Sequence, residues 1–232
     1  MSELDARRLV NAGLHRLHLG CGTVCVHAVG AEMEGAGVVL LGGHGAGKSL
    51  VGLALQERAW RITAGDVALV QVPSVDHGPR LLGGTAAYVV RVRPVARWFP
   101  ALAGETGSGA DKIDLGLAPS ATPVPLRLAV AVDVDGDPRR AQGEVDSVAR
   151  HTAVTVWLRA SAHLLDRVLD DDRMVLREFE NPRALRRRVS MVRDLAWQVP
   201  MVSVCGPPQV IAAHVHALMS RVPSMTGTGG GG

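Results

Sequence analysis

Eight consecutive residues have the types and spacing of a loop that binds phosphate groups. Residues 42–49 read Gly-Gly-His-Gly-Ala-Gly-Lys-Ser and fit the pattern G-x-x-x-x-G-K-[ST]. Glycines leave backbone N–H groups free to surround a phosphate, where a Cβ atom would collide with it. Lys48 supplies a positive charge for the β- and γ-phosphates, and the Ser49 hydroxyl suits Mg²⁺. The pattern therefore predicts a site for ATP and Mg²⁺, with nucleotide-binding residues Gly43, His44, Gly45, Ala46, Gly47, Lys48 and Ser49.

The flanking segments supply the strand and the helix that such a loop requires. Residues 37–41 are an apolar run of strand length, and residues 50–58 have the apolar spacing of a packed helix. The positive N-terminal end of this helix would face the same anion. The alternative is a glycine-rich turn with an incidental lysine. It is weakened because Lys48 and Lys112 are the only lysines in the chain.

Three further residues have side chains suited to phosphate chemistry. A carboxylate must serve the metal or the incoming nucleophile, and Asp66 lies one helix and one strand after the loop. The alternative for Asp66 is a turn residue in a Gly-Asp pair. His27, on an expected strand, is either a catalytic histidine or a buried core histidine. Lys112 either neutralises the transferring charge or is a surface lysine at the end of a strand.

Composition and charge limit the partners that the protein can bind. Aromatic residues make up 3% of the 232 residues and the net charge is +3, which disfavours nucleic acid as a ligand. Apolar runs are too short to span a bilayer and no signal peptide is evident, so we expect no membrane partner and a cytoplasmic location. Three cysteines, an odd number, are expected to be reduced thiols. A homo-oligomer is compatible with these features.

The pattern of apolar segments predicts an α/β fold with a mixed sheet flanked by helices. We expect one domain over residues 1–225 and a disordered glycine-rich tail at 226–232. Residues 31–35 are expected to form a turn, and residues 94–102 a short helix or turn. Strands are expected at 22–29, 38–41, 60–63, 67–72, 88–92, 112–115, 126–134, 152–158 and 201–204, and helices at 4–14, 50–58, 160–169, 182–197 and 207–219.

Residues 23–72 resemble the catalytic domain of HPr kinase/phosphorylase and its relatives, which include the kinases of lasso-peptide gene clusters. The residues that carry the resemblance are His27-Ala28, Gly35 or Gly37, the 42–49 loop, Leu53-Ala54-Leu55, Arg61-Ile62 and Gly65-Asp66. The resemblance implies a fold like the nucleotide-binding core of phosphoenolpyruvate carboxykinase. It also implies ATP-dependent transfer of phosphate to a hydroxyl of a peptide, an amino acid or another small molecule.

The chain departs from this family at the expected proton acceptor. Relatives usually have two adjacent aspartates, the first of which accepts the proton, but Gly65 occupies that position here. The expected catalytic residues are therefore Asp66, His27 and Lys112, with Ser49 and Asp66 as Mg²⁺ ligands. If Gly65 merely lacks a side chain, Gly65→Asp should restore activity. The alternative function is a nucleotide-binding regulatory or accessory protein that has lost transfer. The signature segment of true HPr kinases is also absent from residues 85–95, so HPr is not the expected substrate.

Overall fold

A computed structural model describes residues 2–73, 78–103, 111–117, 122–135, 137, 142–170 and 174–221. The tail at 226–232 lies outside the described residues. Within the described part of the chain, no helix is long and apolar enough to cross a membrane.

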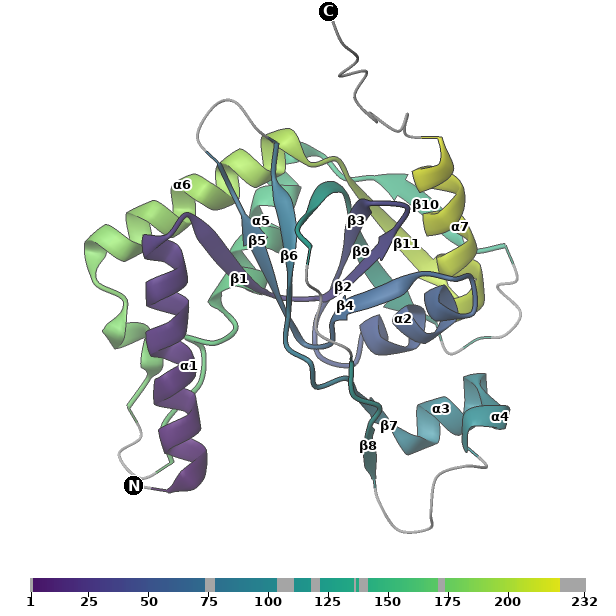
Figure 1. Cartoon of the computed structure of the whole chain (residues 1–232), viewed down its shortest axis with the longest axis horizontal. Coiled ribbons are helices and arrows are strands. Elements are labelled where there is room, and N and C mark those ends of the chain that lie inside the picture. The colour runs from purple at the N-terminus through teal and green to yellow at the C-terminus, as the bar shows by residue number, and fades with distance from the viewer. Residues whose placement is uncertain are drawn as a thin grey trace, which may run out of the picture.

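Nine strands form one mixed sheet, which is the centre of the fold (Figure 1). The main path runs β1-β5-β6-β9-β3-β2-β4, and β11 joins β9 and β10 joins β11. Two short strands, β7 and β8, form a separate antiparallel pair. The bounds are β1 Thr23–His27, β2 Val29–Met33, β3 Ala36–Leu41, β4 Arg61–Ala64, β5 Val67–Gln71, β6 Arg80–Gly84, β7 Val89–Arg91, β8 Lys112–Asp114, β9 Val124–Val134, β10 Glu144–Ser147 and β11 Met201–Gly206.

Helices cover the sheet on both faces (Figure 1). Alternation along β3 explains why: Val38 and Leu40 pack with α2 and α7, whereas Val39 and Leu41 pack with β1, α5 and α6. A strand that is buried on both faces reads as a continuous apolar run. The bounds are α1 Glu3–Gly20, α2 Lys48–Gln56, α3 Val92–Trp98, α4 Pro100–Ala103, α5 Arg150–Ala162, α6 Pro182–Gln198 and α7 Pro208–Ser220, with a 3-10 turn at Leu176–Phe179.

The strand predicted at 152–158 and the helix predicted at 160–169 are both wrong. Residues 150–162 form one helix, α5. The β-branched residues of this segment favour a strand locally, but its buried residues Ala153, Trp157 and Ser161 recur every fourth position. That spacing forms a single helix face, which packs against α6 and β1. Tertiary packing therefore overrides local propensity here.

The turn predicted at 31–35 is confirmed only at its last two residues, because β2 continues to Met33. The chain reverses at Glu34 and Gly35, which have φ angles of 50° and 75°, and β3 begins at Ala36. Positive φ at both central residues is typical of the tightest hairpin turns. Besides β2, two further strands, β6 and β10, were not expected. β10 is exposed along its whole length and β6 ends in two glycines, so neither has a clear apolar alternation.

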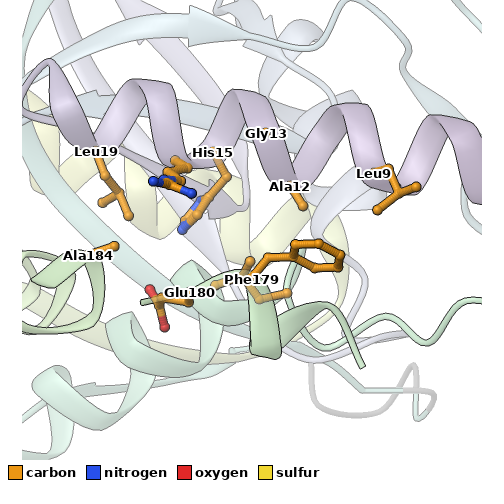
Figure 2. A pocket seen from close by; sticks show the side chains of 10 residues that line it. Leu9, Ala12, Gly13, His15, Leu19, Phe179, Glu180 and Ala184 are labelled. Carbon is orange, nitrogen blue, oxygen red and sulfur yellow. The ribbon is translucent and has the colours of Figure 1, made fainter. Parts of the chain in front are cut away.

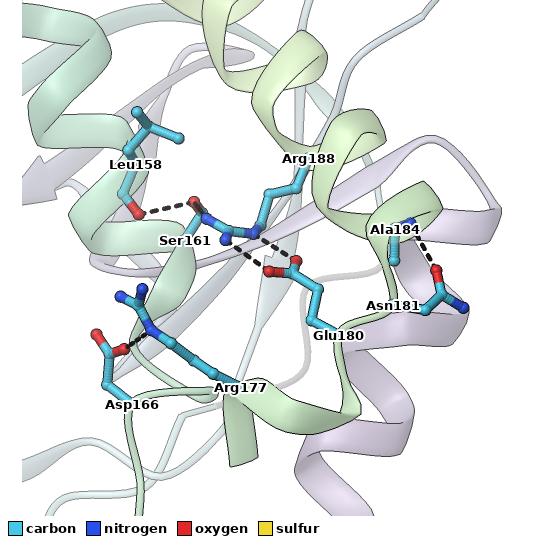
Figure 3. A network of polar contacts seen from close by, with 8 residues as sticks. All are labelled: Leu158, Ser161, Asp166, Arg177, Glu180, Asn181, Ala184 and Arg188. Atoms are coloured by element: carbon cyan, nitrogen blue, oxygen red, sulfur yellow. Dashed lines mark hydrogen bonds and ion pairs between the residues drawn. The ribbon is translucent and has the colours of Figure 1, made fainter. Parts of the chain in front are cut away.

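A buried ion pair joins α6 to the segment that precedes it, and a hydrogen bond from the same arginine reaches α5 (Figure 3). Arg188 donates to both carboxylate oxygens of Glu180 at 2.7 and 2.8 Å, and to the Ser161 hydroxyl at 3.1 Å. The side chains of Arg188 and Glu180 are only 4% and 6% exposed. Asn181 caps α6, since its side-chain oxygen accepts from the Ala184 amide. Removing one partner of such a pair would leave a buried charge without compensation.

A cavity of about 160 Å³ lies beside this ion pair, between α1 and the segment that carries Phe179 and Glu180 (Figure 2). His15 reaches into it from α1 and is 1% exposed. Neither of its ring nitrogens has a hydrogen-bond partner among the described residues. Burial above all, together with the charges of Arg188 and His18, lowers the pKa of His15 to about 4, and Glu180 acts in the opposite direction. The imidazole is therefore neutral at pH 7.

The pH dependence of stability should report on His15. Its pKa is about 4 in the folded chain and about 6.5 in the unfolded chain, so the unfolded chain binds more protons between these values. The His15 contribution is therefore fully present above pH 6.5, is lost as the pH falls toward 4, and amounts to about 3 kcal/mol. Urea unfolding between pH 7 and pH 4 measures it. His15→Leu should flatten this part of the profile and His18→Gln should not; an unchanged profile in His15→Leu would contradict the assignment.

Candidate functional site

The 42–49 loop connects β3 to α2 and is held against the end of β9. Gly47 has φ of 87°, and a Cβ atom there would lie 2.2 Å from Val134 Cγ2. The Val134 amide donates to the Ala46 carbonyl at 3.0 Å. Helix α2 begins at Lys48 without a side-chain cap, so its first N–H groups are free to meet an anion. Only glycine fits this junction between the loop and the helix.

Lys48 is folded into the loop that contains it. Its side chain is 8% exposed, and its Nζ donates to the carbonyls of Gly42 and Gly43 at 2.9 and 3.1 Å. The same Nζ lies 2.9 Å from His27 Nε2. Burial lowers the pKa of Lys48 to about 8, while the nearby Asp66 acts in the opposite direction. An anion at the loop would add the counter-charge that this buried ammonium lacks.

Strand pairing brings His27 and Asp66 together. His27 is the last residue of β1 and lies opposite Val67, the first residue of β5, so Asp66 precedes its partner strand directly. His27 Nδ1 is 3.2 Å from Asp66 Oδ1, an electrostatic contact without good hydrogen-bond alignment. This contact, above all, holds the pKa of Asp66 below its ordinary value, although burial acts against it. The carboxylate is therefore ionised at neutral pH while remaining open to the cavity.

Gly65 occupies a position where no side chain fits. A Cβ atom there would lie 2.0 Å from the Ala87 carbonyl oxygen and 2.8 Å from Tyr88 Cα. Its φ is not positive, so the obstacle is the neighbouring backbone rather than the Gly65 conformation. The expectation that Gly65→Asp would restore a second carboxylate is therefore wrong. Asp66 itself is fixed by Thr85, whose hydroxyl accepts from the Asp66 and Val67 amides at 3.1 Å each.

A cavity of about 490 Å³ gathers most of the residues that the sequence singles out. Of the predicted residues, His27, His44, Gly45, Gly47, Lys48, Ser49, Asp66 and Lys112 line it, whereas Gly43 and Ala46 do not. Lys112 comes from β8, and Arg91 lies opposite it on β7 and lines the same wall. Sequence reasoning missed Arg91, because only strand pairing places it beside Lys112.

A buried tyrosine connects the β7–β8 pair to the loop. Tyr88 is fully buried, and its hydroxyl donates to the Ser49 carbonyl at 2.5 Å. Its backbone amide donates to Asp114 Oδ1 at 2.8 Å. Burial raises the pKa of Tyr88, so the phenol stays protonated as a donor. The wall that carries Arg91 and Lys112 is thereby fixed relative to α2.

A third histidine lies at this site, and the sequence did not indicate it. His163 follows α5, and its ring stacks on His27 with 3.9 Å between ring centroids. His44 of the loop lies 5.2 Å from each of these two rings. No local pattern identifies His163, because its position depends on the helix that the sequence misassigns.

Comparisons with known proteins add little to this geometry. No protein-family model matches the chain, and no curated protein matches it in sequence. Among solved structures, the HPr(Ser) kinase/phosphatase from Coxiella burnetii is similar over 85% of this chain and 97% of that chain, with 13% identity and a TM-score of 0.33. A similarity of this degree carries no argument about function. The family that the sequence resemblance predicts stays a prediction.

Substitution at Gly65 tests the close contact beside Asp66. Gly65→Ala should lower stability by roughly 1–3 kcal/mol, because the Ala87 backbone must move to admit a methyl group. Gly65→Asp should be worse and should not gain activity. Gly13→Ala is the matched control, since a Cβ atom there meets nothing within 4 Å and a helix favours alanine. Chemical denaturation measures all three, and a Gly65→Ala variant as stable as wild type would disprove the contact.

Proposed function

We propose that the protein is an ATP-dependent phosphotransferase that transfers the γ-phosphate to a hydroxyl group. One observation carries the proposal: the buried ammonium of Lys48 lies in a glycine-rich loop, in contact with His27, which contacts the Asp66 carboxylate. These three groups line one cavity whose lining also includes Arg91 and Lys112. Cations around one carboxylate are the arrangement that phosphoryl transfer requires.

The 42–49 loop and the pair Arg91 and Lys112 would contact different phosphate groups of the nucleotide. The first amides of α2 and the loop backbone suit the α- and β-phosphates, as at other glycine-rich loops that precede a helix. Lys48 would exchange its bonds to the Gly42 and Gly43 carbonyls for the β- and γ-phosphates. Lys112 and Arg91 would balance the charge on the transferring group from the other side.

The residues present fit a magnesium ion. Asp66 is ionised and half-exposed, and it lines the same cavity as Ser49 in the first turn of α2. A carboxylate, a hydroxyl and phosphate oxygens are the ligands that Mg²⁺ takes in such sites. When bound, Mg²⁺ would supply positive charge that neutralises the nucleotide phosphates. Ser49 and Asp66 are the residues we propose to hold it.

Asp66 is also the proposed proton acceptor for the substrate hydroxyl. The Asp66 side chain lines the cavity, whereas His27 Nε2 already lies 2.9 Å from the Lys48 ammonium and His27 Nδ1 already lies 3.2 Å from the Asp66 carboxylate. His27 therefore serves as a positioning residue that aligns the lysine with the carboxylate. A peptide, an amino acid or another small alcohol are the substrate classes that the open cavity admits.

The second candidate function is nucleotide binding without efficient transfer, as in a regulatory or accessory protein. The Ala87 backbone leaves no room for a side chain at Gly65, and Asp66 is the only carboxylate among the described residues that line the cavity. This lack of a second carboxylate favours the second candidate. An assay of ATP turnover with and without alcohol acceptors separates the two functions. Binding without turnover would favour this second candidate.

Removal of the lysine charge should weaken nucleotide binding. Lys48→Met retains the aliphatic stem but removes the charge-assisted contact to phosphate, which is worth about 1.5–3 kcal/mol. We therefore expect Mg-ATP affinity to fall at least tenfold in titration calorimetry. Because Lys48 also bonds two loop carbonyls, a melting curve must first show that the variant is folded. Unchanged affinity in a folded variant would exclude the loop as the nucleotide site.

Removal of the Asp66 charge should abolish transfer while leaving the fold intact. Asp66→Asn keeps the size of the side chain but removes the metal ligand and the base, so turnover should fall by roughly 10²–10⁴-fold. The measurement is release of labelled phosphate from ATP, with and without an acceptor. Asp194→Asn is the control carboxylate, because Asp194 lies on α6, where it contacts Arg193 and does not line the cavity. Wild-type turnover in Asp66→Asn would remove this residue from the mechanism.

A further inference from the structure

We propose that His27, His44 and His163 form a binding site for a divalent transition-metal ion of the Zn²⁺ type, with Asp66 as a fourth ligand. The three histidines come from the end of β1, from the 42–49 loop and from the residue after α5. Each offers a ring nitrogen, and these nitrogens all lie within 4.8 Å of one another.

The spacing is close to that of a coordination sphere. Zn–N bonds of about 2.0–2.1 Å place tetrahedral ligand nitrogens roughly 3.4 Å apart. The cluster must therefore contract by roughly 1.5 Å at its widest separation. His44 can supply this movement, because it is exposed and lies between two glycines. A Cβ atom added at Gly43 or Gly45 would meet nothing within 4 Å, so there is open space around the loop at this point.

Two of the histidines hold a nitrogen without a well-made hydrogen bond. His27 Nδ1 is buried and has no aligned partner among the described residues, which is costly for a polar atom. His163 Nε2 meets Arg167 Nη2 at 3.0 Å, and this leaves His163 Nδ1 without a hydrogen-bond partner in the described part of the chain. A metal ion would satisfy both nitrogens at once.

Among the described residues, the group of ligand atoms within 4.8 Å of one another comprises the three histidines alone, so Asp66 must shift toward them to complete the ligand set. Its Oδ1 lies 3.2 Å from His27 Nδ1, which is the separation expected between two atoms bound to one small ion. Three imidazoles and one carboxylate suit Zn²⁺ and related ions, whereas Mg²⁺ prefers oxygen ligands alone. The same cavity thus offers a nitrogen-rich site beside the oxygen-rich site proposed for magnesium.

Occupation of the histidine site should oppose nucleotide binding, a consequence that rests on the proposed function. Asp66 cannot serve both ions fully, and His44 would draw the loop toward His163. A dication on His27 would also repel the Lys48 ammonium, which lies 2.9 Å from that ring. Transition-metal ions would then act as inhibitors at this site.

Calorimetric titration of the folded full chain with Zn²⁺ alone, in a buffer that does not chelate metal, tests the site. We expect one ion per chain and at least a tenfold loss of affinity in His163→Ala, which leaves the residues proposed for the nucleotide unchanged. His151→Ala is the matched control, because His151 is an exposed residue of α5 outside the cluster. Absence of binding to wild type, or equal affinity in His163→Ala, would overturn the proposal.

The consequence for the nucleotide is measured separately. Chains loaded with one equivalent of Zn²⁺ and then desalted are titrated with Mg-ATP. We expect weaker Mg-ATP binding than to the metal-free chain, and no effect of the same treatment on His163→Ala. If Zn²⁺ binds but metal-free protein does not bind Mg-ATP, the proposed function fails and the metal site stands. If Mg-ATP binds and Zn²⁺ does not, the metal site fails and the proposed function stands.

Discussion

The buried ammonium of Lys48 is the constraint on which the site depends. A lysine that is 8% exposed needs oxygen or nitrogen partners, and the loop carbonyls together with His27 Nε2 supply them. His27 is in turn placed by the pairing of β1 with β5, which also sets Asp66 at the same point. The loop, the two strands and the carboxylate are therefore fixed together, and displacement of any one of them leaves a buried polar group without its partner.

Close backbone contacts, more than side-chain bonds, shape the surroundings of this lysine. A Cβ atom at Gly47 would meet Val134, one at Gly52 would meet the Tyr88 hydroxyl at 2.2 Å, and one at Gly65 would meet the Ala87 carbonyl. These glycines allow β9, α2 and the segment before β7 to approach the loop. The absence of the first aspartate is then more than the loss of a side chain, because the backbone of Ala87 fills the space that a side chain would need.

The loop, β3 and α2 could be predicted because their signals are local: an apolar run, glycines at fixed spacing and an amphipathic helix. Asp66 was predicted from its position one helix and one strand after the loop as well as from a sequence resemblance, and His27 chiefly from that resemblance; strand pairing brings the two into contact. Arg91 and His163 could not be predicted. One is placed by its partner on β8, and the other lies at the end of a helix whose β-branched residues favour a strand. Long-range packing decides such positions, and short windows of sequence do not contain it.

In the proposed mechanism one carboxylate both holds a metal ion and accepts a proton, which makes it a weak base, and the lowered pKa of Asp66 makes it weaker. This matters less for phosphoryl transfer than for most proton-transfer chemistry. The transition state is loose, with little bond formation to the nucleophile, so positioning and charge neutralisation contribute most of the rate. Lys48, Arg91 and Lys112 supply positive charge around the cavity without any help from position 65. The cations of this site therefore support the proposed transfer, whose speed rather than possibility would be limited by the lack of room for a side chain at Gly65.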